Sequence, residues 1–161
     1  MKAITILQPY ASLIACGAKQ IETRSWATKY RGPIAIHAGK QWEMYRREIT
    51  YREPFHSALW PNMTKDEMAL NGYGRTKLLP LGVVIAIADL VDCLKVIGRV
   101  SLKIGDEKRI AAVLENGVKV FGNELEFGDY TIDRYAWILA NVRRMKPIPA
   151  KGMQRLWEWE P

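Results

Sequence analysis

The residues that could bind a ligand or take part in catalysis are concentrated between positions 8 and 40. Within this stretch, Glu22 and Arg24 are two residues apart, which places both side chains on one face of a strand. A carboxylate and a guanidinium that point inward together are costly to bury unless they pair or act on a ligand. The sequence therefore predicts either a structural ion pair or a ligand site here.

Other side chains in the same stretch suit a nucleic-acid ligand. The planar fork of Arg24 matches phosphates and base edges, and Tyr10 and Trp26 offer rings on which a base can stack. Lys29 and Arg31 lie in a polar turn, where cations can contact phosphates. Two of these residues have a structural alternative: Arg24 can pair with Glu22, and Trp26 can belong to the core.

Several chemistries are excluded. The sequence has no phosphate-binding loop, no dinucleotide fingerprint, no GxSxG and no HExxH motif. Cys16 and Cys93 are far apart among apolar residues, which predicts two buried thiols in a reducing compartment. They share no ligand spacing with His37 or His56, so we expect no metal and no cofactor.

Charge favours a polyanionic partner. The net charge is +7, and residues 1–40 contain six basic residues against the single acid Glu22. Residues 1–80 hold 12 Lys and Arg against 6 Asp and Glu, whereas residues 81–161 hold 12 against 11. A basic half attracts nucleic acid, although a solvated basic surface that aids solubility is the alternative.

Length and hydropathy predict one domain over residues 1–161. No stretch reaches the roughly 18 apolar residues of a membrane span, so we expect no membrane partner. The first residues lack the apolar core and cleavage site of a signal peptide, and we therefore expect a cytoplasmic protein.

Hydrophobic periodicity predicts about six or seven strands and a few short helices. The expected strands are 2–7, 19–25, 33–38, 82–93 and 135–142, with a hairpin over 110–121 at Asn116-Gly117, helices at 9–17 and 39–53, and an irregular stretch over 54–80 with a short helix near 65–70. The tail over 147–159 should pack back on the body. This order predicts an α+β fold: a small mixed, mainly antiparallel β-barrel with the helix at 9–17 over one opening.

Five segments of the sequence resemble one family. Residues 17–24, GAKQIETR, resemble the GxKxxExR signature of the ASCH (activating-signal-cointegrator homology) domain, a member of the PUA-like superfamily. The similarity extends over LQPY at 7–10, RGPIAIHA at 31–38, FGDY and RYAW between 127 and 137, and PIPAKG with LWEW between 147 and 159. The similarity runs from about residue 4 to residue 159, and it is loosest over residues 39–80.

The resemblance implies a PUA-like barrel with a cleft between the first helix and the barrel, where the family is proposed to bind RNA or other nucleic acid. The expected partner is RNA, another single-stranded nucleic acid or a modified nucleoside, and the oligomeric state stays open. The residues expected to bind it are Gln8, Tyr10, Lys19, Glu22, Arg24, Trp26, Lys29, Arg31 and His37. For His37, a satisfied structural histidine is the alternative.

The resemblance also implies an alternative function, because some ASCH proteins are hydrolases that deacetylate N4-acetylcytidine or cleave RNA. Lys19 and Glu22 would then be catalytic. In the deacetylating type the position three after the lysine is a threonine, whereas here it is Glu22, and Thr23 faces the other side of the strand. A third catalytic residue, a glutamate, has Glu115, Glu124 and Glu126 as candidates. This departure favours binding over that hydrolysis.

Overall fold

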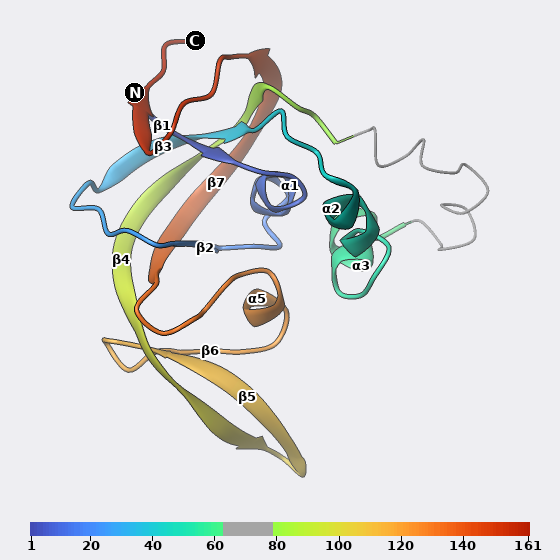
Figure 1. Cartoon of the computed structure of the whole chain (residues 1–161), viewed down its shortest axis with the longest axis vertical. Coiled ribbons are helices and arrows are strands. Elements are labelled where there is room, and N and C mark those ends of the chain that lie inside the picture. Colours follow the sequence, from blue (N-terminus) through green and yellow to red (C-terminus); the bar gives the residue numbers. More distant parts are fainter. Residues whose placement is uncertain (63–78) are drawn as a thin grey trace. The chain divides into compact units, whose positions relative to one another are not determined.

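A computed structural model describes residues 1–62 and 79–161 of the chain (Figure 1). These residues contain eight strands and four short helices. The elements are β1 Lys2–Ile6, α1 Tyr10–Ala15, β2 Ile21–Arg24, β3 Gly32–Ala38, α2 Met44–Ile49, α3 Phe55–Leu59, β4 Val83–Ile104, β5 Glu107–Leu114, β6 Lys119–Val120, α5 Asn123–Glu126, β7 Tyr135–Pro149 and β8 Leu156–Glu158. Among the described helices, none has the length and apolar character needed to cross a membrane.

The strands form one mixed sheet. Hydrogen-bonded neighbours follow the order β2-β7-β4-β3-β1-β8, with β5 added to β4 and β6 added to β5. The pair β1·β3 is parallel, whereas β1·β8, β2·β7, β4·β5 and β5·β6 are antiparallel. The predicted α+β class with a mixed, mainly antiparallel sheet and few helices is confirmed. In the described part of the chain the path of paired strands does not close on itself.

The chain divides into two compact units. The first unit comprises residues 1–18, 33–88 and 141–161, and the second comprises residues 19–32 and 89–140. The long strands β4 and β7 contribute one part to each unit. The single domain expected over residues 1–161 stays a prediction.

The first unit packs around the inner strands of its sheet. Residues Ile34 to Ala38 of β3 are all buried, as a strand covered on both faces requires. Ala3, Ala35 and Val84 form a core cluster with the tail residues Trp157 and Trp159. The Trp159 amide donates to the Met1 carbonyl at 2.8 Å, so the tail packs back as predicted.

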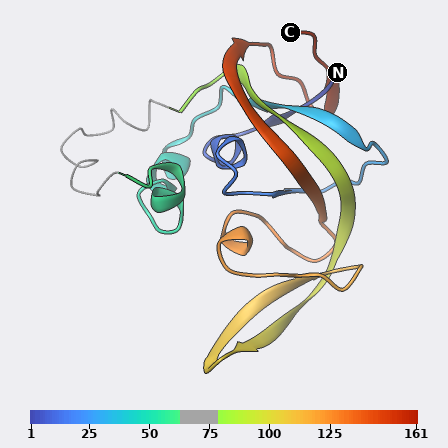
Figure 2. The same cartoon turned by 180° about the vertical axis from the view of Figure 1, so that it is seen from behind.

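The second unit contains a two-stranded ribbon, in which β5 runs antiparallel along β4 (Figure 2), and a hairpin formed by β5 and β6. Its core cluster includes Val96, Leu114 and Tyr130. The predicted hairpin at Asn116-Gly117 is confirmed, and the backbone of Gly117 has φ +85°, which favours glycine.

Three sequence-based boundaries are wrong. The strand expected at 135–142 continues to Pro149 as β7. The strand expected at 82–93 extends to Ile104, because its second part is a half-exposed strand that pairs with β5 and lacks a continuous apolar run. The helix expected at 39–53 is shorter, Met44–Ile49, and a further helix α3 follows within the stretch expected to be irregular. Pro54 starts α3, where the missing amide hydrogen costs nothing. The short helix expected near 65–70 lies outside the described residues.

Gly152 packs directly against His37, so a larger residue at position 152 should destabilise the fold. A Cβ atom at position 152 would overlap His37 and lie 2.8 Å from the Thr5 hydroxyl. The His37 ring cannot move aside easily, because it is buried and its nitrogens lie 3.2 Å from Thr5 Oγ1 and 3.1 Å from the Ala150 carbonyl. We expect Gly152→Ala to lower the free energy of unfolding by about 1–3 kcal/mol in urea titrations.

Gly98→Ala is the matched control, since a Cβ there meets no atom within 4 Å and the backbone needs no positive φ. It should change the free energy of unfolding by less than about 0.5 kcal/mol. Equal destabilisation by the two substitutions would contradict the packing argument.

Candidate functional site

The motif residues Lys19, Glu22 and Arg24 lie at the start of the second unit, on or beside β2. This strand pairs antiparallel with β7, with Glu22 opposite Trp137 and Arg24 opposite Tyr135. The period of two places Glu22 and Arg24 on one face, as predicted, and Glu22 Oε1 lies 3.1 Å from Arg24 Nε. The other carboxylate oxygen, Oε2, lies 3.7 Å from Lys19 Nζ. Glu22 therefore bridges two cations.

Lys19 is the most buried charged group of this cluster. Its side chain is 1% exposed, compared with 12% for Glu22 and 25% for Arg24. The ammonium donates to the Ile21 carbonyl. Burial lowers the pKa of Lys19 below its ordinary value, and the nearby Glu22 carboxylate opposes that effect only in part. Such a lysine can act on a ligand as a buried positive charge, and it gives up its proton more readily than an exposed lysine.

Glu124 fixes the beginning of β2 from the short helix α5. Its two carboxylate oxygens accept hydrogen bonds from the backbone amides of Gln20 and Ile21, each at 2.9 Å. Its charge also raises the pKa of Lys19. Of the three candidate glutamates, Glu124 is the one whose charge acts on Lys19. Glu115 instead accepts a hydrogen bond from the Lys95 amide at 2.8 Å.

Thr23 points to the other face of β2, as the strand period predicts. Its hydroxyl accepts a hydrogen bond from the Asp129 amide at 3.0 Å, and its carbonyl accepts one from Arg134 at 3.3 Å. Thr23 therefore joins β2 to the turn over 127–130. It does not share the face of Glu22 and Arg24.

Trp26 is half-buried and leans on the core. Its ring meets that of the buried Trp137 edge to face, with centroids 4.7 Å apart, and its carbonyl accepts a hydrogen bond from the Trp137 indole at 3.3 Å. This contact fixes the orientation of Trp26 and leaves part of its surface exposed.

The two cations of the turn differ in their surroundings. Arg31 donates to Asp92 at 2.8 Å and to the carbonyls of Thr28 and Tyr30 at 3.0 Å. Lys29 is exposed, and no ion pair or hydrogen bond of its side chain occurs within residues 1–62 and 79–161. Lys29 is consequently the cation of this turn that is available to an anionic ligand.

Gln8, Tyr10 and His37 belong to the first unit. Gln8 is fully buried and braces α1: its carbonyl oxygen accepts from the Ser12 amide at 3.0 Å, and its amide donates to the Pro80 carbonyl at 2.9 Å. Tyr10 meets Phe55 edge to face, with centroids 6.2 Å apart. His37 is buried against Trp157, and burial lowers its pKa. The contacts of Gln8 and His37 match the structural alternative for a polar residue in a core.

A basic segment at the end of the chain escaped the sequence analysis. No acidic residue lies between Asp133 and Glu158, and the exposed cations there are Arg143, Arg144, Lys146, Lys151 and Arg155. The charge balance of residues 81–161 hides this segment, because acidic residues earlier in that half offset it. A shorter averaging window would have found it.

The described residues contain no group of His, Cys, Asp and Glu that could hold a metal ion.

Comparison with known proteins identifies related chains. A family model described as the ASCH domain matches residues 4–149. Activating signal cointegrator 1 of Homo sapiens is 32% identical over 91 residues, and the same protein of Mus musculus is 35% identical over 95 residues. Each match covers 56% of this chain but only 14% of the relative, so the similarity concerns one small part of these larger proteins.

Burial of the Lys19 ammonium should make the free energy of unfolding depend on pH. Between its lowered folded-state pKa and the ordinary value of 10.5, the unfolded chain holds a proton that the folded chain has released. The free energy of unfolding should therefore rise with pH in this window, relative to Lys19→Met, when both are measured from about pH 7 to about pH 10. In Glu22→Gln the rise should begin at lower pH, because the carboxylate that raises the pKa of Lys19 is gone. A difference between wild type and Lys19→Met that is flat with pH would contradict the assignment.

Proposed function

Because this chain belongs to the ASCH domain family, which is associated with RNA binding, we propose that it binds single-stranded RNA through its exposed cations and the cluster around Glu22. The observation that carries the proposal is the acid-free basic segment over residues 143–155. Among its exposed cations, Arg144, Lys146 and Lys151 have no ion pair or side-chain hydrogen bond within residues 1–62 and 79–161, so they can neutralise phosphates and release their counterions, which is the main source of affinity for a polyanion. Lys29 supplies a further exposed cation in the second unit.

Within the cluster, we assign Arg24 and Trp26 to the ligand and Glu22 to its orientation. Arg24 has the most exposed side chain of the three charged motif residues, so its guanidinium can reach a phosphate or a base edge. The exposed part of the Trp26 ring suits stacking on a base. A carboxylate held between two cations, as Glu22 is, can accept from the amino group of a base.

Hydrolysis of a modified nucleoside or of RNA is a second candidate, and one observation favours it. The Lys19 ammonium lies 3.7 Å from Glu22, and burial lowers its pKa. A lysine whose pKa is lowered releases its proton more readily than an ordinary lysine, and a neighbouring carboxylate can activate water. Glu124 adds a second carboxylate beside Lys19, although both of its oxygens are occupied by backbone amides.

The electrostatic proposal predicts a steep loss of RNA affinity with salt. The affinity for a short single-stranded RNA should fall linearly on a log–log plot between roughly 50 and 200 mM salt. Lys29→Ala should reduce the magnitude of the slope by about 0.7, the value for one phosphate contact on a single strand, and should weaken binding uniformly across sequences. Arg31→Ala should weaken binding less, because Asp92 already pairs with Arg31.

Arg109→Ala is the control for this experiment, since Arg109 is exposed but pairs with Glu107 at 2.8 Å. Its salt slope should match that of the wild type in fluorescence anisotropy titrations. An affinity that does not depend on salt would overturn the proposal.

Turnover separates the two candidate functions. If the cluster hydrolyses N4-acetylcytidine or RNA, Lys19→Ala and Glu22→Gln should each lower kcat by at least about 100-fold, the scale of general acid–base catalysis, while circular dichroism shows a retained fold. If it only binds, the wild type releases no acetate and cleaves no RNA, and Glu22→Gln changes which base is preferred, because an amide donates as well as accepts. Acetate release by the wild type that is lost in Lys19→Ala would reverse the order of the two candidates.

A further inference from the structure

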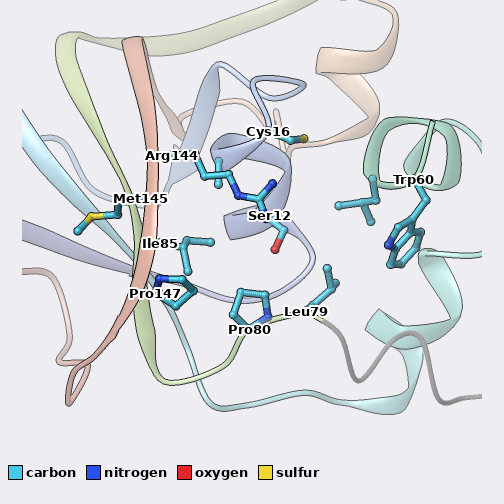
Figure 3. Close-up of a pocket in the computed structure, with 11 residues that line it drawn as sticks. Ser12, Cys16, Trp60, Leu79, Pro80, Ile85, Arg144, Met145 and Pro147 are labelled. Carbon is cyan, nitrogen blue, oxygen red and sulfur yellow. The ribbon is translucent and has the colours of Figure 1, made fainter. Parts of the chain in front are cut away.

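The first unit contains a cavity of about 300 Å³ that includes no residue of the motif at 17–24. It lies among α1, the end of α3, the start of β4 and the last part of β7, and Figure 3 shows its lining. The apolar part of the wall includes Leu59, Leu79, Ile85, Met145 and Pro147, and polar atoms line a comparable share of it. The volume is at the lower end of the range for pockets that enclose small ligands.

Three lining side chains give this cavity a specific chemistry. Arg144 contributes a guanidinium, Ser12 a hydroxyl and Trp60 a large flat ring. In Figure 3 the Arg144 guanidinium reaches toward Ser12, and Trp60 stands apart from them across the lining. A guanidinium and a hydroxyl suit an anion, whereas an indole ring suits a flat, aromatic group.

The polar groups retain capacity for a ligand. Within the described part of the chain, no carboxylate lies at ion-pair distance from Arg144, and its side chain makes no hydrogen bond there. Ser12 Oγ accepts a hydrogen bond from the Gln8 amide at 2.8 Å, which orients the oxygen and leaves the hydroxyl proton to donate. The neighbouring cation Lys146 adds positive charge on the same strand, and the sequence has no acidic residue between Asp133 and Glu158.

We propose that this cavity binds one nucleotide, with the base against Trp60 and the phosphate on Arg144 and Ser12. The inference deepens the proposed function, on which it rests, by identifying a pocket that would take a single unit of the bound RNA. The lining favours a ligand with both chemistries: an uncharged aromatic compound makes no use of the Arg144 guanidinium, and a phosphate alone makes no use of the indole ring or of the apolar part of the wall.

Cys16 was expected from the sequence to be buried, but its thiol is exposed and lines the cavity, so it offers a direct test. We would follow its alkylation by mass spectrometry with uridine, cytidine, adenosine and guanosine 5′-monophosphates, the corresponding nucleosides and inorganic phosphate. At least one monophosphate should slow alkylation of Cys16 several-fold, whereas inorganic phosphate should not. Cys93 serves as the internal reference: it is half-buried in the second unit, where burial raises its pKa.

Substitutions then assign the two ends of the ligand. Arg144→Ala should raise the monophosphate concentration needed for protection by about tenfold, the scale of one charged hydrogen bond. Trp60→Leu should raise it by a similar factor through lost stacking. Arg109→Ala is the matched control: it removes a guanidinium from an exposed strand residue of the second unit that pairs with Glu107 and does not line the cavity, and protection should stay within about twofold of the wild type.

Oligonucleotide binding distinguishes the failure of this inference from the failure of the proposed function. If the wild type binds single-stranded RNA but no monophosphate protects Cys16, and Arg144→Ala binds RNA as Lys146→Ala does, the cavity assignment is overturned and RNA binding stands. Equal protection by inorganic phosphate also overturns the assignment of a nucleotide. If the wild type binds no RNA although a monophosphate protects Cys16, the proposed function fails and the cavity is a nucleotide site in its own right.

Discussion

Hydrogen bonding along two long strands is the constraint on which both units depend. β4 and β7 contribute one part to each unit, and an unpaired row of buried backbone groups along either strand would cost a hydrogen bond at each residue. In the second unit the Val96 amide donates to the Arg134 carbonyl at 2.8 Å, and in the first unit the Ala150 amide donates to the Gly82 carbonyl at 3.0 Å. The motif strand β2 pairs with β7, whereas β3 lies beside β4 and is followed by β1 and β8. Neither set of site residues is therefore held by local structure alone.

Burial of the Lys19 ammonium explains the pattern of the motif around it. An isolated charge in a low-dielectric interior is strongly disfavoured, so it needs a hydrogen-bond acceptor and a nearby carboxylate. The Ile21 carbonyl supplies the first and Glu22 the second, and Glu124 adds charge while it binds two backbone amides. Glu22 in turn contacts Arg24, the charged residue of the motif with the largest exposed fraction. The signature thus describes a graded series, from a buried cation through a bridging carboxylate to a cation at the surface.

Local periodicity was sufficient for the part of the site that lies on one strand. Alternation along β2 predicted that Glu22 and Arg24 share a face and that Thr23 does not, and both are confirmed. The partner of the strand's first amides was not predictable, because Glu124 lies more than 100 positions away in the sequence. The pairing of Arg31 with Asp92, 61 positions apart, was hidden for the same reason. The length of β4 was missed because its second part has the half-exposed pattern of a ribbon, not the apolar run of a central strand.

These ion pairs change how the basic character of the chain should be understood. Counterion release depends on cations that a phosphate can neutralise, not on the formal net charge. Several of the six basic residues in the first forty positions already face a carboxylate, since Lys2 pairs with Glu158, Lys19 and Arg24 with Glu22, and Arg31 with Asp92. The exposed cations of residues 143–155 have no acidic residue among them, and one of them, Arg144, lines a cavity with an indole ring. We therefore propose that Arg144, Lys146 and Lys151, which have no such ion pair within residues 1–62 and 79–161, attract a polyanion to the part of the chain whose cavity could also contact a base.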